Sequence, residues 1–146
     1  AEPILARRHW VTIVLFGGLI TAATLAALSA ALFWLDLPVA DAVSVSFLTL
    51  ASAQLWHVVN MRDLTTPLWN NDVVRNPYIW AATAICIALL AAAVSIPPLA
   101  SVLGITGIDA RGWLLVLVAG GAPVLAVETA RFLLRCFGRA LPSRSL

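Results

Sequence analysis

The chain has 146 residues, of which 62% are hydrophobic and 11% are charged, and its formal net charge is +2. A water-soluble domain of this length needs more polar residues to cover its surface, so the composition excludes a soluble globular protein and indicates a chain that lives in lipid. The basic residues are all Arg and flank apolar segments, which excludes nucleic acid as a partner.

Four long segments without a charged side chain dominate the sequence. A buried helix of a soluble protein needs only about 10–14 apolar residues, whereas crossing the roughly 30 Å hydrocarbon core of a bilayer needs about 20. We therefore predict an all-α fold, in which residues 1–146 form a single integral membrane bundle of four transmembrane helices. The predicted spans cover residues 10–34, 42–60, 77–96 and 112–137.

The connection between the first two spans is predicted to be a tight turn that contains Pro38. Asp41 is placed to cap the second helix, because an Asp side chain can accept a hydrogen bond from a free amide of the first turn. A polar loop over residues 62–75 follows the second span and is the largest hydrophilic segment.

The third helix has strong signals at both ends. Asn76 followed by Pro77 supplies a capping side chain and a first-turn proline. Pro97 and Pro98 must end the helix, because a proline cannot continue the hydrogen-bond ladder. We predict a loop between these prolines and the last helix.

The last helix is predicted to start after Asp109, which can cap it, and a kink is expected at residues 120–123, Gly-Gly-Ala-Pro. Near its other end, Glu128 and Arg131 are spaced i, i+3, so they can form a local ion pair. We interpret that pair as structural.

The arginines predict the orientation of the bundle, because cytoplasmic segments of membrane proteins carry an excess of basic residues. Only Arg111 falls on one side of the four-span topology, so both termini are predicted to be cytoplasmic. Tryptophans near the span ends are typical of the membrane interface. The arginines on the predicted cytoplasmic side are Arg7, Arg8, Arg62, Arg75, Arg131, Arg135, Arg139 and Arg144.

Small residues recur at four-residue spacing in the first and third spans. Such stripes permit close contact between helices, although general richness in alanine explains them equally well. The stripes are Gly18, Ala22, Ala26 and Ala30 in the first span, and Ala84, Ala88 and Ala92 in the third.

The second span carries a polar face inside the predicted membrane region. At about 100° per residue, four polar side chains fall within an arc of about 80°, and Gln54 lies about 60° beyond His57. Polar groups are costly in lipid, so this face must contact other helices or a wet cavity; an ion pathway and interhelical hydrogen bonding are the two interpretations. The four side chains are Ser46, Thr49, His57 and Asn60.

The amide oxygen of Gln54 is the candidate cation ligand on this face, because hard cations prefer oxygen ligands. We predict no catalytic residue, no cofactor and no metal centre. The two cysteines, Cys86 and Cys136, lie far apart in the sequence and lack a metal-ligand spacing.

Three segments together resemble the C-terminal membrane domain of cation-transporting P-type ATPases. The order and the spacing of the segments both match that family, and the resemblance covers nearly the whole chain. The segments are SVSFLTLASAQLWHVVNMRD, similar to the eighth membrane helix and its exit, RNPYIW, similar to the start of the ninth, and IPPLASVLGITGIDARGWLLVLVAGGAPVLAVETARFLLR, similar to the ninth-to-tenth connection and the tenth helix.

The resemblance implies that the four spans are helices seven to ten of a pump, which buttress the helices that carry the cations. In some relatives the eighth helix contributes a cation ligand, and Gln54 occupies what looks like that position. Relatives with an acidic group there can build a further cation site, whereas a neutral Gln implies weaker coordination or none.

The sequence lacks the family's Asp-Lys-Thr-Gly phosphorylation motif and its nucleotide-binding domain. We therefore expect no ATP hydrolysis by this chain alone. The preferred interpretation is a non-catalytic support domain whose partners are the lipid bilayer and the core of a P-type ATPase in a bacterial inner (cytoplasmic) membrane. The alternative is a pump-derived accessory or structural subunit of another membrane complex.

Overall fold

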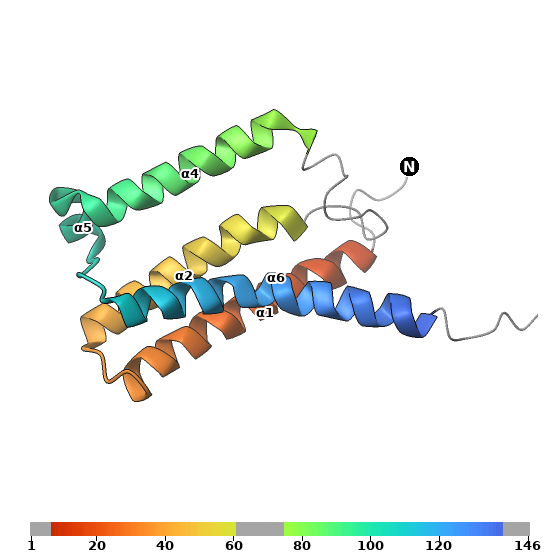
Figure 1. Ribbon diagram of the computed structural model, residues 1–146, viewed down its shortest axis with the longest axis horizontal. Helices are drawn as coiled ribbons and strands as arrows, with labels where there is room; N and C mark the ends of the chain where they lie inside the picture. The colour runs from red at the N-terminus through yellow and green to blue at the C-terminus, as the bar shows by residue number, and fades with distance from the viewer. Residues whose placement is uncertain (1–6, 61–74, 139–146) are drawn as a thin grey trace, which may run out of the picture.

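A computed structural model describes residues 7–60 and 75–138 of the chain. Four helices in these ranges are long and apolar enough to cross a membrane, which confirms the predicted all-α, four-span fold. The predicted polar loop lies, apart from Arg75, outside the described residues. The helices are α1 (Arg7–Phe33), α2 (Val39–Asn60), α4 (Pro77–Ser95), the short α5 (Pro97–Leu103) and α6 (Ala110–Gly138) (Figure 1).

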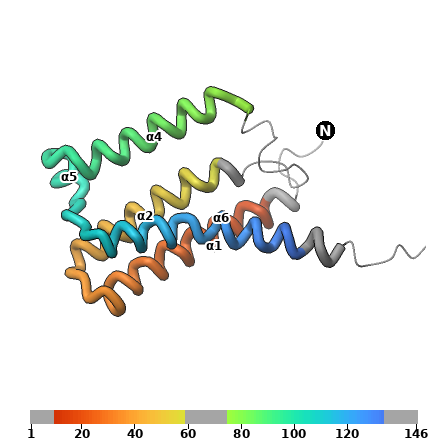
Figure 2. The backbone as a smooth tube through the Cα atoms, viewed as in Figure 1, coloured from red at the N-terminus to blue at the C-terminus, as the bar shows by residue number. Residues whose placement is uncertain are grey.

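Helices α1, α2 and α6 form a three-helix core, whereas α4 stands to one side. Helix α2 packs extensively against both α6 and α1, and it is the most buried of the four candidate spans. Helix α4 contacts α2 at few positions, and α5 turns back beside the end of α4 (Figures 1 and 2). The chain direction in both figures shows that α2 and α6 run the same way, while α1 and α4 run the opposite way.

Small and branched side chains make up the centre of the core. Because lipid tails are as apolar as leucine, helices in a bilayer associate through close packing, which small residues allow. Each of the three core helices contributes to the buried cluster, which consists of Ala27 and Ala31 of α1, Ala42, Val45 and Leu48 of α2, and Val116 of α6.

The small-residue stripe expected on α1 is not the face that packs in this bundle. Ala22 and Ala26 are exposed, whereas Ala27 and Ala31, one position further along, are buried. On α4 the buried alanine is likewise Ala93 and not a member of the expected stripe. The alanines of each helix spread over about half of its circumference, so the sequence could not specify which of them face the core.

Glycine brings α6 close to α2 at two points. A Cβ atom at Gly112 would clash with the Ile108 side chain and lie 3.2 Å from the Val45 Cγ2 atom. A Cβ atom at Gly120 would lie 2.9 Å from the Ser52 Cβ atom and 3.5 Å from the Thr49 carbonyl oxygen. The absence of a side chain at Gly120 therefore lets the two backbones approach each other directly.

The start of α2 differs from the sequence prediction. The helix begins at Val39, so Asp41 lies inside its first turn and is not the capping residue. The first intrahelical bond already runs from the Ala42 amide to the Pro38 carbonyl at 3.0 Å, which places Pro38 at the capping position. A negative side chain in the first turn still interacts favourably with the positive end of the helix dipole.

The predicted caps of α4 and α6 are confirmed. The Asn76 Oδ1 atom accepts a hydrogen bond from the Tyr78 amide at 3.0 Å, and the Asp109 Oδ1 atom accepts one from the Gly112 amide at 2.8 Å. Both bonds satisfy amides that have no partner inside the helix.

The segment after α4 is more ordered than the sequence predicted. Helix α4 ends at Ser95 as expected, but the next two prolines start the short helix α5, because proline is tolerated in a first helical turn. Gly104, with φ of 66°, ends α5 in the left-handed conformation that glycine adopts readily. Further along, α6 continues through Pro123 as one helix.

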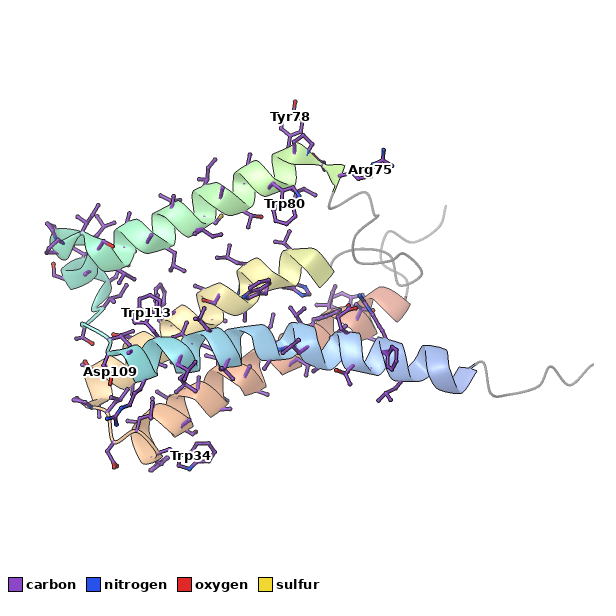
Figure 3. All side chains as sticks on the ribbon, in the orientation of Figure 1. Trp34, Arg75, Tyr78, Trp80, Asp109 and Trp113 are labelled. Carbon is purple, nitrogen blue, oxygen red and sulfur yellow. The ribbon has the colours of Figure 1, made fainter. Side chains whose placement is uncertain are left out.

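Aromatic and charged side chains mark the two ends of the bundle. Trp34, Asp109 and Trp113 lie at one end, and Arg75, Tyr78 and Trp80 lie at the other (Figure 3). Trp and Tyr settle at the headgroup level of a bilayer, because one part of the ring system is apolar and another is polar. Their positions at the two ends of the bundle are those typical of residues at a bilayer interface.

The Gly120 contact leads to a prediction about stability. Gly120→Ala should lower the free energy of unfolding by about 1–3 kcal/mol, because the new methyl group overpacks the contact with α2. Gly121→Ala is the matched control, since nothing lies within 4 Å of a Cβ atom there and both changes raise helix propensity equally. Thermal unfolding in mild detergent measures both; equal Tm values would contradict the close contact.

Candidate functional site

The exposure of the polar side chains of α2 increases around the helix, from Thr49 to Gln54. Thr49, at one edge of the predicted arc, is 0% exposed. Ser46 and His57, which lie about 60° and 80° from Thr49, are half-buried, and Gln54, about 140° from Thr49, is exposed. Asn60 ends α2, and its side chain lies outside the described residues. The structure therefore does not gather the predicted residues into one pocket, but directs them from the core outward.

Gln54 shares its exposed side of α2 with apolar residues. Val43, Phe47 and Leu50 are 52%, 42% and 38% exposed, and with Gln54 they fall within an arc of about 60°. We call these four residues the Gln54 face. Because Gln54 lies inside the span Val39–Val58, its amide would face hydrocarbon if lipid covered this side. An amide without a hydrogen-bond partner in an apolar medium costs several kcal/mol.

His57 lies against α1. Its ring centroid is 4.5 Å from that of Phe16, with the two ring planes tilted by 56°. Such a tilted arrangement is favourable between aromatic rings, so the contact joins the N-terminal half of α1 to the C-terminal end of α2. This geometry assigns His57 a packing role in the structure described.

The predicted ion pair on α6 is confirmed. The Arg131 Nη1 atom lies 2.8 Å from the Glu128 Oε1 atom, and the Arg131 side chain is 10% exposed. An ionised carboxylate near a membrane boundary is less costly when a guanidinium donates to it directly. Among the described residues, no group of three or more His, Cys, Asp and Glu side chains could hold a metal ion.

Ser44 is a structural residue that sequence analysis did not single out. It is 2% exposed, and its hydroxyl donates to the Ala40 carbonyl at 2.9 Å. The same oxygen accepts a hydrogen bond from the Thr106 amide at 3.0 Å, and the Thr106 Oγ1 atom lies 3.1 Å away. Because the single Ser44 proton is already used, the Thr106 hydroxyl is the donor in that contact. Ser44 thus ties the segment before α6 to α2.

These features define an integral membrane helical domain with its most polar helix at the centre. Residues 1–133 match the family described as "Cation transporting ATPase, C-terminus", and the chain belongs to that family. It is the C-terminal transmembrane part of such ATPases and not their catalytic domain.

A relative supports the same assignment. The chain is 29% identical over 87 residues to "Calcium-transporting ATPase 1" of Bacillus cereus (strain ATCC 10987 / NRS 248). The match covers 60% of this chain and 10% of that protein, so the chain corresponds to a small part of the relative. No solved structure gives a significant match.

The role of Ser44 can be tested by substitution. Ser44→Ala should lower the free energy of unfolding by about 1–3 kcal/mol, because the partly buried amide and hydroxyl of Thr106 lose their acceptor. Ser101→Ala is the control, since the Ser101 hydroxyl is exposed and bonds only locally to the Pro98 carbonyl. Thermal unfolding monitored by tryptophan fluorescence measures both, and a Ser44→Ala protein as stable as the control would contradict this role.

Proposed function

We propose that this chain is the membrane support domain of a cation-transporting P-type ATPase and that it braces the helices that carry the ions. It is non-catalytic by itself, and the remainder of the pump supplies phosphorylation and nucleotide binding, in the same polypeptide or in a bound one. The observation that carries the proposal is the Gln54 face. A polar amide on an otherwise apolar, exposed side of a span calls for another helix to cover it.

The proposal gives Gln54 the part of a weak cation ligand. Its amide oxygen suits a hard cation, but a neutral amide binds such an ion less tightly than a carboxylate does. The name of the Bacillus relative makes Ca²⁺ the first cation to test. Ser46 and Thr49, which lie closer to the core, belong to the contact between helices and not to the ion site.

The first test is to purify the native complex from its membrane in mild detergent and to identify its polypeptides by mass spectrometry. We expect phosphorylation and nucleotide-binding domains to be present in stoichiometric amount, either fused to this chain or bound to it. A different stable partner, with no such domains, would overturn the proposal and favour a pump-derived structural subunit.

Gln54 gives a prediction about ion affinity. In the reconstituted pump, Gln54→Ala should weaken the apparent affinity for the cation about 3- to 10-fold, as expected when one weak ligand worth about 1 kcal/mol is lost. Gln54→Glu should strengthen it, because a carboxylate is the better ligand. Leu50→Ala on the same face controls for packing. Ion-dependent phosphorylation measures all three, and unchanged affinity in both Gln54 variants would reduce Gln54 to a packing residue.

We also propose that both termini face the cytoplasm of a bacterium and that α5 lies on the outer side of the inner membrane. In a variant with Cys86 and Cys136 replaced by Ala, a membrane-impermeant maleimide should label Ser101→Cys in intact cells but should not label Arg75→Cys. Both sites are exposed in the bundle, so access depends on the side of the membrane. Labelling of Arg75→Cys alone would show that the orientation is the opposite of the one proposed.

A further inference from the structure

Thr49 carries a buried hydroxyl that makes none of the local hydrogen bonds seen elsewhere in the helices. Several others donate to the carbonyl four residues earlier, as Thr24 does to Ile20 and Thr83 does to Ile79, both at 2.8 Å. The Thr49 Oγ1 atom is fully buried and has no hydrogen-bond partner among the described residues. An unsatisfied buried hydroxyl is costly, particularly in lipid, so its local environment needs an explanation.

Close to Thr49, α6 contains a carbonyl group that lacks its usual helical donor. Gly120 packs against the Thr49–Ala53 backbone, and Pro123, one turn further along, is buried. Proline has no N–H group, so the Ala119 carbonyl lacks its usual donor within the helix. Ala119 is partly buried and packs against the core cluster. Lipid tails have no donor to offer its carbonyl.

Both groups lie near the middle of their spans. Thr49 is at the centre of Val39–Val58, and residues 119–123 are at the centre of Ala110–Leu133. This depth is where an unpaired polar group costs most, because bulk water is furthest away.

From these observations we propose that Thr49 and the Ala119 carbonyl hold a single internal water molecule between α2 and α6, with Ser52 at the same contact as a third partner. The Thr49 hydroxyl makes no direct hydrogen bond to this carbonyl. A water molecule can donate to the carbonyl and also bond to the hydroxyl. Buried waters in proteins typically have about three such partners.

Charge favours water over a cation at this position. Within the described spans the acidic side chains are Asp41 and Glu128, which lie towards the ends of α2 and α6 and not at their centres. A cation would therefore be held there by neutral oxygens alone, at a depth where an uncompensated charge is strongly disfavoured. A neutral ligand with both donor and acceptor capacity fits this chemistry.

A double-mutant cycle in the native complex tests the proposal. Thr49→Val keeps the shape of the side chain and removes the hydroxyl; it should lower Tm by about 3–8 °C, whereas Thr49→Ser should keep most of the stability. Pro123→Ala restores the helix donor to the Ala119 carbonyl. In that background the Thr49→Val loss should fall to less than half, because the water has already lost a partner.

If Thr49→Val lowers Tm equally in the wild-type and Pro123→Ala backgrounds, the proposal of a shared water is overturned. A Thr49→Val protein that is as stable as the wild type, or more stable, would also overturn it. A second measurement needs no variant: solid-state NMR of the protein with ¹³C-labelled threonine should show rapid magnetisation transfer from water to Thr49. Transfer no faster than that to a lipid-facing threonine would also overturn the proposal.

Discussion

The close approach of α6 to α2 is the contact on which the rest of the structure depends. In a bilayer the hydrophobic effect does not hold helices together, so the core must rely on packing distance. Gly112 and Gly120 allow that distance, and Val116 between them fills the space against Val45 and Leu48. Ser44 then fixes the start of α6 relative to α2, because its hydroxyl binds Thr106.

This contact also sets the direction of each polar group on α2. With α1 and α6 covering one side of the helix, Thr49 is enclosed and Gln54 is left on the uncovered side. The rotation of α2 about its own axis that buries its small residues therefore places the Gln54 amide on the outside of the three-helix core. A domain with this division between a packed side and an exposed, largely apolar side that carries one amide is suited to contact with further membrane helices.

Local chemistry explains what could be predicted from the sequence. The four spans, the caps at Asn76 and Asp109, and the pair Glu128–Arg131 all depend on residues close in sequence, and the structure contains each of them. The packing face of α1 could not be predicted, because its alanines spread over about half of the helix circumference. The Ser44–Thr106 bond could not be predicted either, since 62 residues separate the partners. The sequence placed Gln54 beside the polar face of the second span. Only the packing of α1 and α6 against α2 showed that this side chain lies outside the core.

The measurement that tests this account most directly is site-specific photo-crosslinking in native membranes, with the reactive side chain in place of Gln54. If this chain braces the ion-carrying part of a pump, the probe should join α2 to another transmembrane helix that belongs to the pump core, in the same polypeptide or in a partner. Adducts formed only with lipid would show that the Gln54 face is uncovered in the membrane and would contradict the account.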